Sequence, residues 1–409
     1  MNAFENLALV VFWTSAAAVA YAYVAYPMLL AVAARLFGVR PEPPAVADSD
    51  LPSVTLLIAV NNEAEIIAAR LENAVAIDYP RDRFAIVVAS DGCTDGTDAI
   101  VKTFASRGVT LDTLQERRGK AATLNRVIPT LTSDVLVLSD GNTFTEPDSV
   151  RQLARWFVDP SVGVVCGKLV LVDRATGHNV DGLSWRIETA LKDREAQLGA
   201  INGVNGAIYA LRRALFSPLP PATILDDLVL PLRVRLATGC RLLFDPEAVA
   251  VEETAVGVEA EFNRRARIGA GGFQAITILW PLLDPRRGWI AFTFFSHKVL
   301  RWTCPLFLVA LLVANLPLAT QPLYGLFLVA QVAVHLTALA SNSSRVWSRL
   351  PRVVRLGLMF HAMNTALLVG FWRWLRGAHS GVWQRTDRGG MSAPGKTPSN
   401  GAAGRASEQ

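Results

Sequence analysis

Two adjacent carboxylates, Asp226 and Asp227, are well suited to acid–base chemistry. They stand just ahead of a stretch, residues 229–237, whose pattern predicts a helix, so one carboxylate could cap the helix while the other stays free. An adjacent acid raises the pKa of a carboxyl toward the range that a general base needs near neutral pH. We therefore interpret the pair as a candidate source of a base that accepts a proton from a hydroxyl. The alternative is that both are helix-start charges without chemistry.

Polar residues also stand where three predicted strands end. The first strand runs into Asn62 and Glu63, the second into Asp91 and Gly92, and a later one into residues 140–142, Asp-Gly-Asn. In open α/β sheets the ligand binds beyond the carboxyl ends of the strands. Acidic and amide groups there suit a ribose, a uracil edge or a divalent metal bridging to a pyrophosphate, because hard cations prefer oxygen ligands. Each Asp alone could instead be a turn former or a helix cap.

Two basic segments could supply the positive charge that a phosphate needs. Lys120 follows Gly119 at the start of a predicted helix, where an ammonium and free N–H groups would face an anion. Arg264 and Arg267 share one face of a later helix, so they could clamp a diphosphate. The alternative for these arginines is that they extend to anionic lipid headgroups.

An α/β domain is predicted to position these residues. Between about residues 51 and 250, short β-branched runs alternate with helical stretches, a pattern typical of βαβ units. The predicted strands are 54–60, 84–89, 135–138 and 162–165, and the predicted helices are 63–75, 94–107, 121–129 and 147–158. The strands are nearly continuous apolar runs, which indicates buried parallel strands. Their polar ends would then lie along one rim of the sheet.

Apolar runs on both sides of this domain predict membrane segments. The first run, about residues 7–34, carries no charge and exceeds the roughly 20 residues that a spanning helix needs, so we expect a retained anchor. Arginines follow it, which places the N-terminus outside and the α/β domain in the cytoplasm. Residues 306–316 and 324–340 predict a helical hairpin. The last run, 356–372, is short and is followed by more arginines, so we expect a re-entrant or interfacial helix there.

Composition excludes several classes of protein. The chain has 409 residues with 51% hydrophobic and 18% charged residues, which excludes a disordered chain and a single small domain. The formal charge is only +5, and the arginines gather beside apolar runs, which favours a membrane surface over nucleic acid. The four cysteines lie far apart without CxxC spacing, so neither a zinc site nor a disulfide framework is indicated, and a reducing compartment fits.

In motif order, roughly residues 51–301 resemble the membrane-bound family 2 glycosyltransferases, which include cellulose, hyaluronan and poly-N-acetylglucosamine synthases. The resemblance implies a GT-A fold that binds a nucleotide sugar, usually UDP-linked, with a divalent metal, Mg²⁺ or Mn²⁺. The implied nucleotide-sugar-binding residues are Asn62, Glu63, Asp91, Gly92, Lys120, Asp140, Arg264, Arg265 and Arg267. The implied acceptor-side residues are Asn205, Gly206 and Ile268, and the implied metal ligands are Asp140 and Asn142.

The acidic pair resembles a family pair whose second carboxylate deprotonates the acceptor hydroxyl, which makes Asp227 the implied base beside Asp226. Two positions depart from the family pattern. Asn142 replaces the second Asp of the DxD motif, and a neutral amide is a weaker ligand for Mg²⁺ than a carboxylate. Ile268 replaces a Trp that stacks on the acceptor sugar in polymer synthases, and an aliphatic side chain lacks the flat aromatic face.

These expectations give an α/β, GT-A-like nucleotide-sugar-binding domain inserted between transmembrane helices. The expected parts are an N-terminal anchor and linker (1–50), a cytoplasmic glycosyltransferase domain (51–257), interfacial helices with the arginine motif (258–295), a hairpin plus a short membrane or re-entrant helix (296–375) and a cytoplasmic tail, disordered at its end (376–409). The expected protein is an inverting hexosyltransferase of the bacterial inner membrane, acting on a polysaccharide or lipid-linked acceptor and not on nucleic acid.

Three alternatives to a polymer-forming enzyme stay open. One is an enzyme that adds a single sugar to a lipid carrier, which the missing Trp at Ile268 favours. Another is a catalytically weakened scaffold or regulatory subunit of a membrane polysaccharide synthase complex, which would have the other synthase subunits as partners. The third, a nucleotide-binding transporter component, is disfavoured because the sequence has no GxxxxGK[ST] loop.

Overall fold

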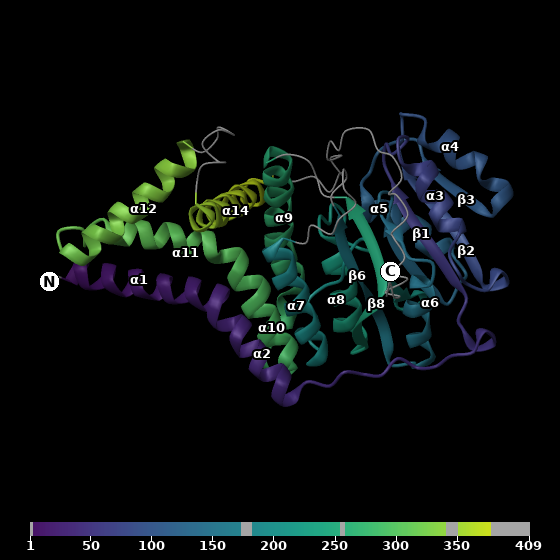
Figure 1. Cartoon of the computed structure of the whole chain (residues 1–409), viewed down its shortest axis with the longest axis horizontal. Coiled ribbons are helices and arrows are strands. Elements are labelled where there is room, and N and C mark those ends of the chain that lie inside the picture. Colours follow the sequence, from purple (N-terminus) through teal and green to yellow (C-terminus); the bar gives the residue numbers. More distant parts are fainter. Residues whose placement is uncertain (1–2, 173–181, 254–257, 341–350, 378–409) are drawn as a thin grey trace, which may run out of the picture.

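The computed structural model describes residues 3–172, 182–253, 258–340 and 351–377. Its central feature is an eight-stranded mixed sheet with the strand order β3-β2-β1-β4-β7-β6-β8-β5 (Figure 1). The strands are β1 Val54–Val60, β2 Phe84–Asp91, β3 Val109–Leu114, β4 Val135–Asp140, β5 Phe144–Thr145, β6 Val162–Val172, β7 Tyr209–Arg212 and β8 Arg241–Glu253. The predicted α/β class is confirmed.

Four strands form a parallel block, in which β1 pairs with β2 and β4, and β2 pairs with β3. Every residue of β1 is buried, as its continuous apolar sequence predicts for a strand covered on both faces. Beyond this block β7 pairs antiparallel with β4 and with β6, so the predicted strand β6 is not a neighbour of the parallel block. The sequence analysis missed β3, β5, β7 and β8, because β5 and β7 are short and polar residues interrupt β3 and β8.

Helices cover both faces of the sheet. Side chains alternate along β1, so Leu57 joins one buried apolar cluster, whereas Leu56 and Ile58 join the other. The first cluster includes residues of α5 (Lys120–Val127), α8 (Asp226–Thr238) and α9 (Val258–Leu279), and the second includes residues of α3 (Ile67–Val75), α4 (Thr97–Thr103) and α6 (Ser149–Ala154). The sheet is therefore the middle layer of a three-layer domain.

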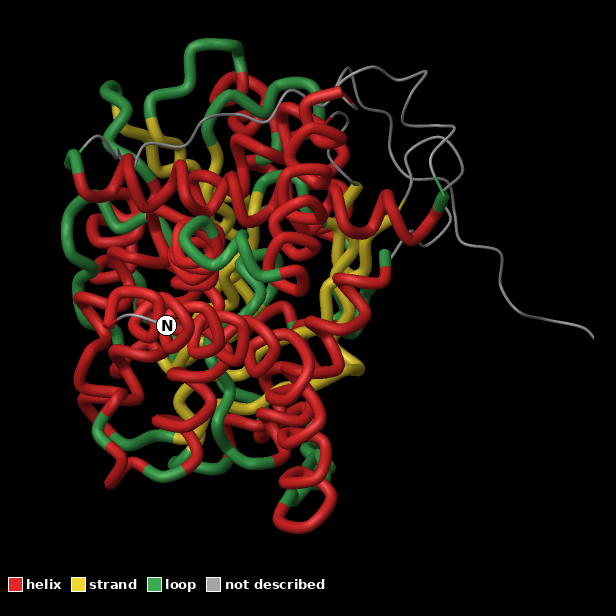
Figure 2. The backbone as a smooth tube through the Cα atoms, turned by 90° about the vertical axis from the view of Figure 1, so that its left-hand side faces the viewer, coloured by secondary structure: helices red, strands yellow, loops and turns green. Residues whose placement is uncertain are grey.

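Long apolar helices gather at one end of the molecule, at the left of Figure 1. α1 (Ala3–Ala20) continues through a π-helical turn (Tyr21–Ala25) into α2 (Tyr26–Phe37). In the same way, α10 (Trp289–Thr293) continues through a second π-helical turn (Phe294–Val299) into α11 (Leu300–Asn315). The other two helices are α12 (Pro322–Ala340) and α14 (Arg352–Leu375). Figure 2 views this end, with the N-terminus and these helices in front of the sheet.

Three continuous helices in the described ranges are long and apolar enough to cross a membrane: 3–37, 289–315 and 353–375. The first and second contain the predicted anchor and the first arm of the predicted hairpin, and the second arm is a shorter apolar helix, 322–338. The last helix is longer than its apolar run indicated, so by length it could span a bilayer. Its placement at the interface stays a prediction.

Two helices connect the sheet to the apolar end. α7 (Leu183–Gln197) packs against α2, and α14 packs closely along α9. Glycines permit this second contact, because a β-carbon at Gly370 would lie 2.4 Å from the carbonyl oxygen of Ala266. Figure 1 shows α7 and α9 between the sheet and the apolar end.

Candidate active site

The polar strand ends predicted from the sequence meet at one edge of the sheet. Val60 is in register with Ser90 of β2, and Ala59 is in register with Asp140 of β4, so β1, β2 and β4 end at almost the same level. Because these strands are parallel, the residues that follow them share one rim. This is the edge at which open α/β sheets bind ligands.

The loops after β1 and β2 are tied together by the predicted polar residues. Asn62 adopts a left-handed backbone conformation, with φ 56°, and its Oδ1 accepts a hydrogen bond of 2.8 Å from the Thr94 backbone N–H. Gly92 also has a positive φ, and a β-carbon there would lie 2.6 Å from the Arg117 nitrogen. Glu63 lies beside the turn after β4, since its Cγ would be 3.3 Å from a β-carbon at Gly141.

The carboxylate of Asp91 fixes the loop that leads into α5. It accepts hydrogen bonds from the backbone N–H groups of Arg118, at 2.7 Å, and Gly119, at 2.8 Å, and it is almost completely buried. These bonds satisfy both oxygens of the carboxylate and hold the start of α5, where Lys120 follows. A contact of Asp91 with a nucleoside stays a prediction.

Lys120 lies between carboxylates from two different elements. Its Nζ is 2.7 Å from Asp140 Oδ1 at the end of β4 and 3.2 Å from Asp226 Oδ2 at the start of α8. Burial lowers the pKa of Lys120, but the charges of Asp140 and Asp226 outweigh that effect and hold it well above its ordinary value. The Lys120 side chain therefore carries a fixed positive charge at the rim.

Asp227 belongs to the same cluster of acidic residues. The sequence placed the acidic pair ahead of a helix, whereas in the structure Asp226 and Asp227 are the first two residues of α8. Burial, and next the charge of Asp226, raise the pKa of Asp227 to about 6. A β-carbon on Gly206 would lie 3.4 Å from Asp227 Oδ2 and 3.6 Å from Asp140 Oδ2, so both carboxylates converge above this glycine. We call Lys120, Asp140, Asp226 and Asp227 the rim cluster.

Two residues near the rim cluster were missed by the sequence analysis. Arg70 of α3 is completely buried and donates a hydrogen bond of 3.1 Å to Ser139 Oγ, just before Asp140. Burial lowers the pKa of Arg70 to about 10, against an opposing effect of Asp140. Tyr209 of β7 is also fully buried, and burial, then Asp226, raise the pKa of its hydroxyl. No sequence signal marks either residue, because both stand in ordinary helix or strand patterns.

The arginine motif lies on α9 and is partly paired within its own helix. Arg264 Nε is 2.8 Å from Glu261 Oε2, and Arg265 Nε is 2.6 Å from Glu261 Oε1. In the part of the chain that the structure describes, neither arginine forms an ion pair with the rim cluster. Arg267 and Ile268 are half-buried on the same helix. A diphosphate clamp by these arginines therefore stays a prediction.

The predicted acceptor-side residue Asn205 is held by its neighbours. Its Nδ2 donates a hydrogen bond of 2.7 Å to the carbonyl of Gly167, and its Oδ1 accepts one from Lys192 Nζ. Gly206 follows directly and faces the rim cluster. The sequence therefore named residues at this place, but it did not indicate Lys192 of α7.

Of the predicted metal ligands, Asp140 ends β4 and Asn142 stands on the turn that follows it. Among the described residues, no three His, Cys, Asp or Glu side chains form a group that could hold a metal ion alone. The Oδ2 of Asp140 faces Gly206, whereas its Oδ1 binds Lys120. A divalent cation here would need further oxygen ligands, and the diphosphate of a nucleotide carries such oxygens. The donor set fits a metal that is shared with a substrate.

Comparison with known proteins places the domain in a family of enzymes. Residues 55–217 match the sequence model of glycosyl transferase family 2. The chain is 26% identical over 248 residues to a beta-monoglucosyldiacylglycerol synthase from a Nostoc species, covering 58% of this chain and 52% of the relative. It is 26% identical over 246 residues to a poly-beta-1,6-N-acetyl-D-glucosamine synthase of Staphylococcus aureus, covering 57% of this chain and 58% of the relative. The chain thus spans about half the length of the curated relatives it matches.

A solved structure shares the fold over most of the chain. It is a mannosyltransferase from Pyrobaculum calidifontis in complex with GDP-Man and Mn²⁺. The superposition has a TM-score of 0.68 and covers 91% of this chain and 99% of that chain, with 22% sequence identity. The GT-A-like architecture expected from the sequence is confirmed.

Proposed function

The chain carries a glycosyl transferase family 2 domain, and on this premise we propose that it is a membrane-integral inverting glycosyltransferase. It would move a sugar from a nucleotide donor to a lipid or polysaccharide acceptor. The observation that carries the proposal is the rim cluster. In this cluster Lys120 forms ion pairs with Asp140 and Asp226, and the neighbouring Asp227 has a raised pKa. A cation for a diphosphate and a base for a hydroxyl are then adjacent.

The proposed base is Asp227. Its carboxylate takes the proton of an acceptor hydroxyl while that oxygen forms a bond to the anomeric carbon of the donor sugar. The bond between the anomeric carbon and the diphosphate oxygen breaks on the opposite side, and the nucleoside diphosphate leaves with the electron pair. A pKa of about 6 suits this role, because the group is deprotonated near pH 7 and still basic enough to accept a proton.

The leaving diphosphate needs positive charge where its own charge develops. Lys120 supplies a buried ammonium at the rim, and Arg267 of α9 is the proposed second cation. A bound Mg²⁺ or Mn²⁺ would neutralise the same diphosphate, with Asp140 as the proposed ligand and Asn142 beside it. Asn62, Glu63, Asp91 and Gly92 are proposed to line the nucleoside end, where the loops after β1 and β2 meet.

The donor is proposed to be a UDP-sugar, on the resemblance to polysaccharide synthases. One curated relative is named for a lipid acceptor and another for a polysaccharide, so the names support either class. Ile268 offers no aromatic face to a sugar polymer, which favours a single transfer to a lipid. We propose the bacterial inner membrane as the location, with the rim cluster on the cytoplasmic side.

The test is nucleotide release from purified protein in nanodiscs. UDP-sugars and GDP-mannose are supplied one at a time with bacterial lipid extract, with Mg²⁺, Mn²⁺ or EDTA. Release with one donor that EDTA stops, together with a glycosylated lipid or polymer, would support the proposal and identify the donor. Nucleotide binding without any release would refute it in favour of the scaffold alternative.

A further inference from the structure

A small hollow lies beside the rim cluster, and the proposed mechanism does not use it. It is shallow, with only about 10 Å³ of enclosed space and otherwise open to solvent, and its lining includes Lys168 of β6, Glu188 and Lys192 of α7, and Asn205. Asn205 precedes Gly206, over which the Asp227 carboxylate lies. The charge of Lys192 also acts on Asp227, since it opposes the rise in pKa caused by burial and Asp226. The hollow therefore adjoins the proposed base. We call it the lysine hollow.

The two lysines of the hollow have no carboxylate partner among the described residues. The Lys168 side chain forms no hydrogen bond or ion pair with another described residue, although it is half-buried. Lys192 Nζ contacts two uncharged groups, Asn205 Oδ1 and, at 3.9 Å, Cys166 Sγ. Two partly buried ammonium groups that are not directly paired with a carboxylate suit an anion, because a bound anion would pair with both.

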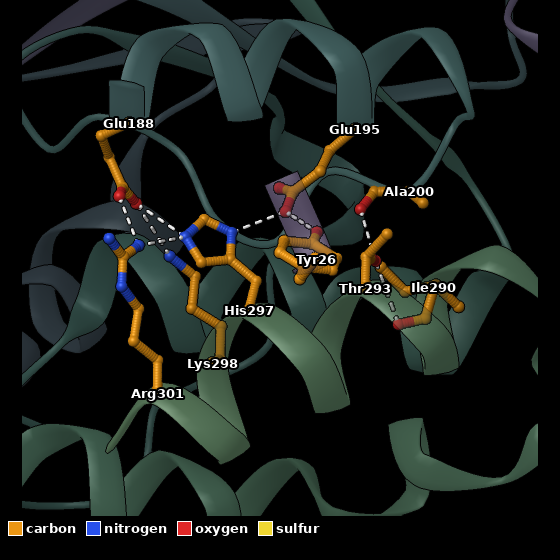
Figure 3. A network of polar contacts seen from close by, with 9 residues as sticks. All are labelled: Tyr26, Glu188, Glu195, Ala200, Ile290, Thr293, His297, Lys298 and Arg301. Carbon is orange, nitrogen blue, oxygen red and sulfur yellow. Dashed lines mark hydrogen bonds and ion pairs between the residues drawn. The ribbon is translucent and has the colours of Figure 1, made fainter. Parts of the chain in front are cut away.

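The one acidic residue in the lining is already neutralised from outside the hollow. Glu188 lies 3.0 Å from His297 Nε2, 3.5 Å from Lys298 Nζ and 2.9 Å from Arg301 Nη1 (Figure 3). Burial raises the pKa of Glu188, but these basic groups outweigh that effect and hold it well below its ordinary value. Glu188 therefore balances charges of the 289–315 helix and not those of Lys168 and Lys192.

The same network fixes the wall of the hollow to the apolar helices. Glu195, two turns after Glu188 on α7, accepts a hydrogen bond of 2.7 Å from the Tyr26 hydroxyl and contacts His297 Nδ1 at 2.6 Å (Figure 3). Tyr26 belongs to the 3–37 helix and His297 to the 289–315 helix. α7, which lines the hollow, is thus held by two candidate membrane spans, so the hollow lies on an element that joins the sheet to the apolar helices.

We propose that the lysine hollow binds a phosphate of the acceptor, so that the acceptor is a phosphate-bearing membrane lipid whose free hydroxyl lies at Asp227. Lysine binds phosphate as a point charge, and two ammonium groups on different elements can flank one phosphate. The inference rests on the proposed glycosyl transfer and names the class of acceptor that it uses.

The test compares lipids that differ in the phosphate. Phosphatidylglycerol carries a phosphate and free hydroxyls, whereas diacylglycerol carries a hydroxyl alone, and each is supplied at low mole fraction in neutral nanodiscs. Wild-type protein should use phosphatidylglycerol. Lys168→Gln should raise the acceptor KM about tenfold, the effect of one lost charge-assisted contact, without changing the donor KM. Lys168→Arg should restore the acceptor KM, and Lys102→Gln, an exposed change on α4, should have no effect.

Glycerol 3-phosphate serves as a soluble probe on the unaltered protein. It should inhibit competitively against the lipid acceptor and not against the donor, and its own glycosylation would identify the headgroup alone as the ligand. Preference for diacylglycerol, or a Lys168→Gln protein that matches the wild type with phosphatidylglycerol, would overturn the inference while leaving the proposed transfer intact. Absence of nucleotide release with every donor and acceptor would overturn both.

Discussion

Ionisation of Asp227 should set the pH dependence of transfer. Burial, and next the charge of Asp226, raise its pKa to about 6, against an ordinary Asp value of about 3.9. The proposed base works only when it is deprotonated, so transfer should be maximal well above pH 6. At about pH 5, one unit below this pKa, about a tenth of the molecules would carry the free carboxylate, and the rate should fall in proportion.

The raised pKa of Asp227 also affects the stability of the fold, which should fall with rising pH whereas the rate of transfer should increase. A carboxyl whose pKa is higher in the folded state binds its proton more tightly there, so it stabilises the fold at low pH and loses that effect as pH rises through about 6. A shift of two pKa units corresponds to a change of about 3 kcal/mol in the free energy of unfolding. Because Asp227 is partly exposed, we expect a smaller change of about 1–2 kcal/mol. Asp227→Asn, which cannot ionise, should therefore be more stable than the wild type at about pH 8 and about equally stable at pH 4.

The assay is kcat/KM for the acceptor across this pH range at saturating donor, with denaturant unfolding of the same proteins in detergent. Asp227→Asn should bind the nucleotide as the wild type does and lose transfer by a factor of at least about 100, the usual contribution of general-base catalysis. Asp148→Asn, an exposed change at the start of α6, is the matched control. A flat pH profile, or an Asp227→Asn protein with near-normal transfer, would refute the assignment.

Three further changes test the arrangement of the rim cluster. Gly206→Ala adds a methyl group within ordinary contact distance of Asp227 and Asp140. The free energy of unfolding should change by less than about 0.5 kcal/mol, whereas the rate of transfer should fall. An unimpaired rate of transfer would place the reacting atoms elsewhere. Lys120→Gln removes the buried ammonium and should weaken nucleotide binding about tenfold or more in a titration, and unchanged binding would argue against a diphosphate contact. Arg70→Met leaves Ser139 without its donor and should destabilise the fold by about 1–3 kcal/mol in denaturant unfolding, whereas an unaltered midpoint would show that Arg70 is dispensable.

The elements that the sequence predicted correctly share a strong local signal. Strands β1, β2 and β4 are short, β-branched apolar runs followed at once by polar residues, a pattern typical of buried strands. In contrast, β8 contains Asp245 and Pro246 within its span, and β7 has only four residues. These strands form because the sheet offers them partners, which the local pattern does not encode.

The sequence by itself determined the apolar end segments, the α/β class and the identity of the polar residues at the strand ends, because these depend on composition and on the spacing of neighbouring residues. The tertiary structure alone decided that Lys120 binds Asp140 and Asp226, that Asp227 faces Gly206, and that Glu188 is neutralised by the 289–315 helix. These groups come from elements far apart in the chain, so their contacts, and the charge and burial that shift their pKa values, exist only once the layers have packed.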